Sequence, residues 1–320
     1  MRSLKYHELD REYARSILAV NLPWSPLDFI REISKSGDRL LYAEQLTAIP
    51  NLDDDLCFVS KDKHDLIGVF ARKLPWDSEF FGYGVARLDG IFPLSEPYYQ
   101  PYADYTRLAQ ELMARARLKD IRYLFAHVDT RDIATIRALG QVGFSVIDTR
   151  VLYHMSLKGY KPQERYSVRF ATVDDISCLQ RVAAEEVNLY DRFHSDPFIK
   201  KEDADRLMYK WVEASIAENF ADIVLVPAVS NPGAFMTVKN HTYNWETWGL
   251  KVVQFVVTAI SREFKGWYQK LFSEVHCYLQ QIGAEHSYIS TQTANKAVIW
   301  VFEKFGYGFG RGELVLRIIL

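Results

Sequence analysis

The feature that most constrains the fold is an internal repeat in which two similar segments lie 163 residues apart. The segment Ala134–Val146 aligns with Ala297–Phe309, and each copy reads as a helix that ends at a glycine and leads into a strand. The glycines are Gly143 and Gly306, and glycine readily adopts the left-handed conformation that ends a helix. This pattern is common in α/β proteins, but its recurrence at half the chain length predicts two duplicated halves.

Apolar strand-like runs alternate with segments of helical spacing along the whole chain. This alternation predicts an α/β or α+β fold with a mixed sheet. No linker rich in proline or serine separates the two copies of the repeat, so we expect halves 1–162 and 163–320 that share one body or a continuous sheet.

The charges nearly cancel, because 39 Lys and Arg residues face 41 Asp and Glu residues for a net charge of −2. A nucleic-acid-binding protein needs a surplus of basic residues, so we expect no nucleic-acid partner. Hydrophobic residues make up 48% of the chain and charged residues 25%, which excludes a disordered or fibrous protein. Aromatic residues reach 14%, and aromatics beyond the needs of a core often line pockets for ring-shaped ligands.

The cysteines and the lengths of the apolar runs indicate the cellular compartment of the protein. Cys57, Cys178 and Cys277 lie far apart and no CxxC motif occurs, so neither a zinc site nor a disulfide framework is indicated. The first 15 residues are polar and lack the apolar core of a signal peptide. No run of 18 apolar residues occurs, so we expect a cytoplasmic protein without a membrane partner.

Three segments of the second half resemble the GCN5-related N-acetyltransferases. Val168–Ile176 resembles their opening strand and first helix. Val253–Ile260, followed by Ser261–Gly266, resembles their central strand and the turn that binds the pyrophosphate of coenzyme A. Thr291–Tyr307 resembles their closing strand–helix segment. The resemblance implies a tandem of two such halves.

Two regions resemble the branch that acylates nucleotide-linked amino sugars, such as the dTDP-fucosamine acetyltransferases. One is Leu74–Gly82, and the other combines Arg192–Phe198 with Ala204–Val212. The enzymes that acylate dTDP-3-amino-3,6-dideoxygalactose resemble the chain most. The resemblance implies transfer of an acetyl or 3-hydroxybutanoyl group from coenzyme A to the sugar amine, for O-antigen or other surface polysaccharide (lipopolysaccharide) synthesis. It implies no metal, and we also expect a homodimer.

The resemblance places the pyrophosphate on the turn Lys265–Gln269, at a helix N-terminus that favours anions. Lys265 adds positive charge and Gly266 allows close approach of the backbone. The first half has no such turn, which implies that it is degenerate, with a structural and substrate-lining role, and that the second half binds acyl-coenzyme A. The implied coenzyme A contacts are Ala259, Ile260, Ser261, Lys265, Gly266, Trp267, Tyr268, Asn295 and Phe302.

The chain departs from the family pattern at three positions. Tyr268 stands where a second glycine is usual, and Glu263 stands where glutamine or arginine is common. Phe302 stands seven residues after Asn295, where the family has a tyrosine that protonates the leaving thiolate. A displaced acid (Tyr307 or Tyr190) or positioning alone would then serve. The alternatives are that the turn is only a polar connection and that Asn295 only caps its helix.

The segment Tyr190–Pro197 gathers titratable side chains between two helices and is the expected acceptor site. His194 titrates near neutrality and is the candidate base, with Asp196 orienting it or binding a hydroxyl. Arg192 suits a diphosphate, because its guanidinium donates paired hydrogen bonds. The expected catalytic residues are therefore His194, Asp196 and Tyr190. The alternative is a solvated loop that caps a helix.

The segment Leu74–Gly82 reads as an aromatic loop that opens with a proline. The expected substrate contacts in it are Trp76, Asp77, Phe80 and Phe81, since aromatic rings stack on a base or sugar and a carboxylate accepts hydrogen bonds. We expect this loop to face Tyr190–Pro197, and the alternative is an apolar plug between the halves. Tyr243–Trp248 reads as an aromatic hairpin tip.

Two other functions compete with acyl transfer to a nucleotide-linked amino sugar. The first is a catalytically inactive relative that binds a ligand or a partner, which Tyr268 and Phe302 favour. The second is an acyltransferase for a different amine, although near-neutral charge disfavours a polycationic substrate.

Overall fold

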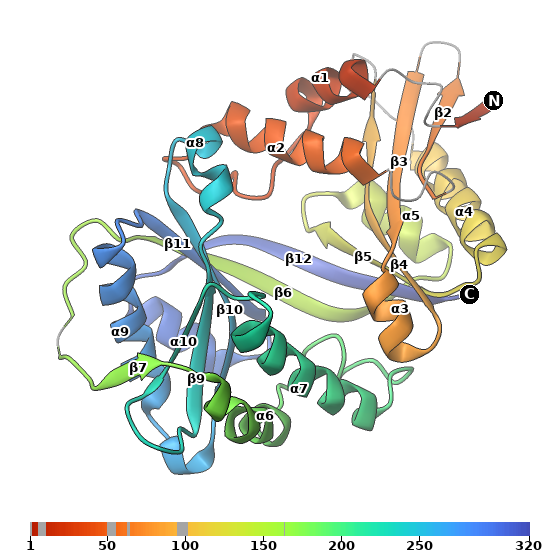
Figure 1. The fold of residues 1–320 in the computed structure, drawn as a ribbon. Helices are drawn as coiled ribbons and strands as arrows, with labels where there is room; N and C mark the ends of the chain where they lie inside the picture. Colours follow the sequence, from red (N-terminus) through yellow and green to blue (C-terminus); the bar gives the residue numbers. More distant parts are fainter. Residues whose placement is uncertain (1, 6–10, 50–55, 63–64, 95–101, 163) are drawn as a thin grey trace. The chain divides into compact units, whose positions relative to one another are not determined.

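A computed structural model describes residues 2–5, 11–49, 56–62, 65–94, 102–162 and 164–320 (Figure 1). The chain divides into two compact units, of which the first comprises residues 1–149 and 311–320 and the second residues 150–310. Gln163, near the boundary expected from the repeat, lies outside the described residues. None of the helices that the structure describes is long and apolar enough to cross a membrane.

The first unit begins with a strand and two helices and continues with alternating strands and helices. Its elements are β1 (Arg2–Lys5), α1 (Arg11–Asn21), α2 (Lys35–Ala48), β2 (Phe58–Asp62), β3 (Asp65–Lys73), α3 (Pro75–Phe81), β4 (Gly84–Pro93), α4 (Tyr102–Leu118), β5 (Ile121–Asp129) and α5 (Ile133–Gln141), followed by β6 (Ser145–Ser156), which continues into the second unit.

The second unit repeats this order with small additions. Its elements are β7 (Val168–Phe170), α6 (Ile176–Glu185), α7 (Lys201–Ala217), β8 (Ile223–Pro227), β9 (Ala234–Lys239), α8 (Trp245–Trp248), β10 (Val252–Ile260), α9 (Trp267–Gln281), β11 (His286–Gln292) and α10 (Lys296–Lys304), followed by β12 (Gly308–Ile319), which continues into the first unit. Short 3₁₀ turns precede α6, α8 and α9.

Both units have the same strand topology. The strand order is β1-β2-β3-β4-β5-β12 in the first unit and β7-β8-β9-β10-β11-β6 in the second. In each order the fourth and fifth strands are parallel and the other neighbours are antiparallel. The predicted mixed sheet is therefore confirmed.

The last strand of each unit comes from the other copy of the repeat. Residues 150–156 of β6 pair with β11, and residues 313–319 of β12 pair with β5. This exchange is why the compact units differ from the halves 1–162 and 163–320 that the repeat suggests. The repeat itself forms as expected, because Gly143 and Gly306 follow α5 and α10 with φ angles of 97° and 87°.

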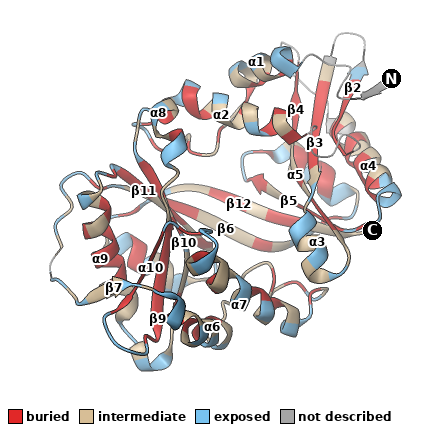
Figure 2. Ribbon diagram, viewed as in Figure 1, coloured by how far each residue is buried: buried red, intermediate tan, exposed pale blue. Residues whose placement is uncertain are grey.

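Each unit buries apolar side chains on both faces of its strands (Figure 2). In the first unit α4 and α5 cover one face, and α1 and α2 cover the other. In the second unit α9 and α10 cover one face, and α6 and α7 cover the other. Helices cover both faces because parallel strands are apolar on both sides and must be shielded from water on each.

Two aromatic segments differ from their sequence predictions. The expected loop Leu74–Gly82 contains the helix α3, which starts with Pro75 at its first position and ends at Gly82 with φ 72°. Proline suits a first helical position because its missing N–H has no intrahelical acceptor there. The expected hairpin tip Tyr243–Trp248 instead forms a 3₁₀ turn and the short helix α8.

Candidate functional site

The two parallel strands of the second unit separate beyond their first few residues. β10 pairs with β11 only from Val252 to Gln254, although β10 continues to Ile260 and β11 to Gln292. The register between β10 and β9 also shifts between Phe255 and Thr258. At this bulge the Thr237 hydroxyl donates to the carbonyl of Val257 at 3.1 Å and accepts from its N–H at 2.8 Å. Beyond Gln254, the backbone N–H and C=O groups of β10 and β11 therefore do not pair with each other.

The turn after β10 leads into a helix whose first turn lacks a side-chain cap. A 3₁₀ turn at Arg262–Phe264 is followed by Gly266, which has φ 90° and precedes α9. A Cβ on Gly266 would meet no atom within 4 Å, so its backbone conformation and not the space around it calls for glycine. Lys265 and Gly266 are exposed. Uncapped amides at a helix start, beside a lysine, suit an anion.

Tyr268, which stands in place of the usual second glycine, packs inward. Its ring lies 5.9 Å from that of Phe272, centroid to centroid, beside the apolar core. Burial raises the pKa of the Tyr268 hydroxyl, so it stays neutral. The side chain is half-buried and packs against the core of the second unit. Trp267 beside it is half-buried against the same core.

Phe302 is part of the core. It is fully buried, and its ring lies 5.9 Å from Phe272 and 5.7 Å from Tyr153. Asn295 precedes α10 and its side chain makes no capping hydrogen bond, so the alternative that it serves only as a helix cap is not what the structure shows.

Tyr307, the proposed displaced acid, is also buried. Its hydroxyl contacts Ser287 Oγ at 2.6 Å and His276 Nε2 at 2.8 Å. Burial raises the pKa of Tyr307 and lowers that of His276 to about 4. The pair is therefore neutral near pH 7 and serves the core as a hydrogen-bonded network.

The segment Tyr190–Pro197 forms the expected turn between α6 and α7. His194 is 2% exposed at its side chain, with Nδ1 2.8 Å from Asp191 and Nε2 3.2 Å from Asp205. Burial alone would lower the pKa of His194, but the hydrogen bonds and charges of the two carboxylates outweigh it and raise the pKa. A ring held between two carboxylates is protonated over a wider pH range than a free histidine, which disfavours its predicted role as base.

The other predicted site residues of this turn are Asp196, Tyr190 and Arg192, and each has different neighbours. Asp196 is buried, and its carboxylate accepts the N–H of Phe198 at 3.0 Å. Tyr190 is exposed, and the guanidinium of Arg192 lies 4.0 Å from the centre of the Phe193 ring. The ring nitrogens of His194 contact Asp191 and Asp205, so Asp196 is not the residue that orients His194, contrary to the prediction. The predicted roles of Asp196, Tyr190 and Arg192 toward a substrate stay predictions.

The aromatic helix α3 belongs to the first unit and has no buried residue. Trp76 is 49% exposed and stacks on Phe80 with centroids 5.4 Å apart. Phe80 in turn contacts Phe81 edge to face at 4.9 Å. Asp77 is half-buried beside them. These rings form a ready surface for a flat ligand, and the expectation that they face the second unit stays a prediction.

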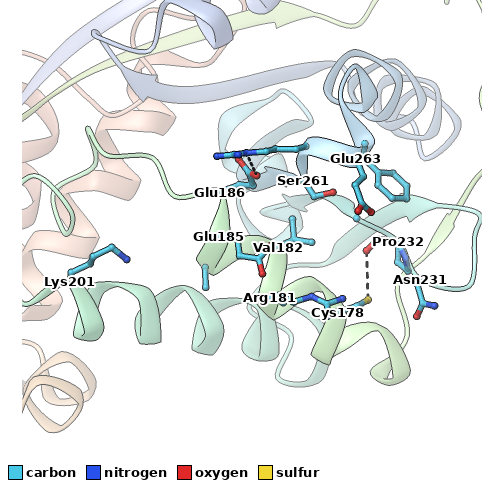
Figure 3. A pocket seen from close by; sticks show the side chains of 14 residues that line it. Cys178, Arg181, Val182, Glu185, Glu186, Lys201, Asn231, Pro232, Ser261 and Glu263 are labelled. Atoms are coloured by element: carbon cyan, nitrogen blue, oxygen red, sulfur yellow. Dashed lines mark hydrogen bonds and ion pairs between the residues drawn. The ribbon is translucent and has the colours of Figure 1, made fainter.

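A cavity of about 800 Å³ adjoins the turn after β10, and the sequence interpretation missed it (Figure 3). It is lined by α6, the turn between β8 and β9, and the segment Ser261–Phe264. Gly233 lets these two turns approach, because the N–H of Ser261 donates to its carbonyl at 2.7 Å and a Cβ there would clash with Phe264. The signal that could have found it is the Asn-Pro-Gly turn at residues 231–233.

Charged side chains of both signs line this cavity. Arg262 contacts Glu186 at 3.6 Å, and Arg181, Lys201 and Glu263 line the walls around them (Figure 3). The volume lies within the range of about 300–1,000 Å³ typical of small-molecule sites. Among the residues that the structure describes, no group of three or more His, Cys, Asp or Glu side chains is arranged to hold a metal ion.

Comparisons with known proteins find structural likeness without sequence likeness. No family model matches the sequence, and no curated protein matches it. A GCN5-related N-acetyltransferase from Sphaerobacter thermophilus has a TM-score of 0.55 at 11% identity, over 87% of this chain and 85% of that one. A GNAT-family acetyltransferase from Colwellia psychrerythraea has a TM-score of 0.54 at 10% identity, over 100% of both chains.

A third similar structure is a GCN5-related glucosamine N-acetyltransferase region of a fungal multi-domain β-N-acetylglucosaminidase. Its TM-score is 0.62 at 12% identity, over 99% of this chain and 38% of that one. The separated parallel strands, the turn before α9 and these likenesses together show that the chain has the fold of the GCN5-related N-acetyltransferases.

Proposed function

We propose that this chain transfers an acyl group from coenzyme A to an amine, with the coenzyme bound by the second unit. The observation that carries the proposal is the separation of β10 from β11 beside the uncapped start of α9. Separated strands offer N–H and C=O groups to the amides of the pantetheine arm, and the α9 amides with Lys265 suit the pyrophosphate.

The residues at the opening between the strands fit a thioester substrate. Val256 is 36% exposed at the bulge and offers an apolar contact to an acyl chain. Between the bulge and the turn, the chain continues through Ala259, Ile260 and Ser261, which we expect to lie along the pantetheine arm. Coenzyme A brings the activated carbonyl, and the chain aligns it with the amine, which alone accelerates such a reaction strongly.

The proton transfers do not depend on a tyrosine at the usual position, because Phe302 lies in the core. Attack by a neutral amine on the thioester carbonyl forms the amide bond and releases the thiolate of coenzyme A. The amine proton leaves to solvent or to a base, and the thiolate takes up a proton from solvent. His194 is the base predicted from the sequence, its two carboxylate partners disfavour that role, and the pH dependence of its variant decides it.

The acceptor that we propose is an amino sugar on a nucleotide, such as dTDP-3-amino-3,6-dideoxygalactose. Support comes from the two segments that resemble this branch and from the exposed ring of Trp76 with the half-buried ring of Phe80 stacked on it, since aromatic rings can stack on a base. The likeness to a glucosamine N-acetyltransferase region also favours a sugar amine. Such a reaction would supply an acylated sugar for surface polysaccharide synthesis.

Release of coenzyme A thiol tests the proposal. Acetyl- and 3-hydroxybutanoyl-coenzyme A are each offered with dTDP-amino sugars, glucosamine and simple amines. We expect thiol release that depends on a dTDP-amino sugar. Release with simple amines alone would assign a different acceptor.

Binding of coenzyme A without turnover on any amine would favour the inactive relative, which the departures from the family pattern at Tyr268 and Phe302 also favour. Failure of coenzyme A to shift the melting temperature at millimolar concentration would overturn the proposal.

A further inference from the structure

The first unit contains a cavity at the place where its own parallel strands separate. β4 pairs with β5 only from Gly84 to Leu88, although β4 continues to Pro93. The register between β3 and β4 shifts at this point, which leaves Asp89 as the extra residue of a bulge. Bulges are common beside functional sites because they redirect a side chain. The cavity has a volume of about 170 Å³.

Two arginines fix the carboxylate at the bulge. Arg72 Nε donates to Asp89 Oδ2 at 2.9 Å, and Arg87 Nη2 lies 2.7 Å from Asp89 Oδ1. Asp89 is 10% exposed at its side chain, whereas Arg87 is 36% exposed and lines the cavity. The bulge therefore presents a fixed carboxylate together with a reachable guanidinium.

Asp129 of β5 and Arg311 and Glu313 of β12 also line the cavity, and each of them forms ion pairs. Asp129 is 2% exposed at its side chain, with Arg131 at 2.7 Å and Arg311 at 3.6 Å. Arg311 also contacts Glu313 at 2.5 Å. Arg311 Nε is buried and has no hydrogen-bond partner among the described residues. A buried donor without an acceptor is costly, and an oxygen atom of a ligand would satisfy it.

Aromatic rings complete the wall. Trp24 is half-buried and lines the cavity together with Tyr42. The Tyr42 hydroxyl donates to the carbonyl oxygen of Asp89 at 3.1 Å, which ties this ring to the bulge. His127 of β5 lines the same cavity. An aromatic face beside fixed hydrogen-bonding groups suits a ring that has one apolar face and polar edges.

Stability alone does not explain this arrangement. Buried ion pairs contribute little net stability, because desolvation offsets most of their attraction. The cavity is lined by charges of both signs, because the guanidiniums of Arg87 and Arg311 lie among the carboxylates of Asp89, Asp129 and Glu313. Arg72 and Arg131 pair with Asp89 and Asp129 from outside the lining. A charged ligand of either sign would meet a like charge, whereas a hydroxyl both donates and accepts hydrogen bonds.

We propose that this cavity of the first unit binds a single uncharged, hydroxylated ring of about monosaccharide size. The volume is below the range of about 300–1,000 Å³ of drug-sized ligands, which limits the occupant to roughly one ring. Asp89 and Arg87 bind its hydroxyls, Arg311 Nε donates to one of its oxygens, and Trp24 covers its apolar face. The proposal does not depend on acyl transfer by the second unit.

Saturation-transfer NMR on the full chain tests the proposal with sugar rings of three charge types. D-Glucose, D-galactose and their 6-deoxy forms are the neutral probes, D-glucosamine is the cation and D-glucuronate is the anion. We expect at least one neutral ring to bind with millimolar affinity, and the charged rings to bind no more tightly. Tighter binding of glucuronate or inorganic phosphate by tenfold or more, or no binding of any neutral ring, would overturn the proposal.

Variants locate the site. Trp24→Ala and Arg87→Met are each expected to weaken binding of the neutral ring about tenfold. Tyr13→Ala on α1 and Arg117→Met on α4 are matched controls that leave it unchanged. Circular dichroism checks that each variant is folded, and if Trp24→Ala unfolds, the partly exposed Arg87 decides. Unchanged binding in a folded Arg87→Met variant would place the sugar elsewhere and contradict the proposal.

Discussion

The two units contain the same pair of separating parallel strands, but they line the opening with different chemistry. In the second unit the opening has an apolar bulge at Val256 and leads to a glycine turn and an uncapped helix. In the first unit the bulge residue is Asp89, and charged side chains fill the opening. The two units share this backbone geometry, whereas the side chains at the opening differ. The second unit suits a long cofactor with an anionic end, and the first unit suits a small polar ring.

The largest expected effect is on coenzyme A binding, and it is tested by two matched glycine variants, one in each unit. Gly266→Asp in the second unit should weaken coenzyme A binding by roughly 100-fold, because aspartate is strained at φ 90° and repels the pyrophosphate. Gly82→Asp in the first unit meets the same strain at φ 72°, with no atom near its Cβ, and should leave binding unchanged. Equal losses, measured by calorimetry, would show that backbone strain alone is responsible.

The second prediction concerns His194 and the carboxylates on either side of it. His194→Ala leaves Asp191 and Asp205 facing each other and should lower the free energy of unfolding by roughly 2–4 kcal/mol near pH 6. Because the folded-state pKa is raised, this contribution is complete below the unfolded pKa near 6.5 and is lost as the pH rises through the folded value. Urea denaturation at several pH values measures it.

His241→Ala is the matched control, because burial lowers the pKa of His241. Its effect on pH dependence should have the opposite sign, with wild-type stability rising as the pH approaches 6.5 from below. Turnover of His194→Ala decides its other role. A fall of 10²–10⁴ with the acid limb of the pH–rate profile abolished would establish the predicted base.

Local patterns were readable from the sequence because they depend on neighbours along the chain. The repeat predicted α5 and α10 with their terminal glycines, and the apolar runs predicted most strands. The exchange of β6 and β12 was not predictable, since each strand has the same local pattern whichever partner it pairs with. The helix α3 was missed because its aromatic residues were read as a loop, although Pro75 and Gly82 are ordinary helix boundary signals.

The site could be predicted only where one segment supplies it. The turn at Lys265–Gly266 is contiguous, so the resemblance to the family could place an anion site on it from one segment. The first-unit cavity combines Trp24, Asp89, Asp129 and Arg311 from segments far apart in the chain, so no local motif marks it. Of the two partners of His194, Asp191 lies in the same turn, whereas Asp205 was not readable because it comes from the following helix.

The third prediction tests whether the first unit contributes to the acceptor site through α3. Trp76→Ala should raise the KM for a dTDP-amino sugar about five- to tenfold with little change in kcat, because stacking acts on substrate and transition state alike. Tyr13→Ala removes another exposed aromatic ring of the same unit and serves as control. An unchanged KM would confine the acceptor site to the second unit.

The smallest expected effect concerns the missing tyrosine of the second unit. Phe302→Tyr should change turnover by less than about tenfold, which is under about 1.4 kcal/mol of barrier. The ring is fully buried between Phe272 and Tyr153, so the added hydroxyl enters the core instead of the opening between β10 and β11. Burial of that hydroxyl should cost about 1–3 kcal/mol of stability, measured by thermal unfolding. A large gain in turnover would show that the hydroxyl reaches the thiolate and that proton donation had been limiting. A loss of several orders of magnitude would show that Phe302 packs around the acyl chain, which would extend the apolar character of Val256 along the opening.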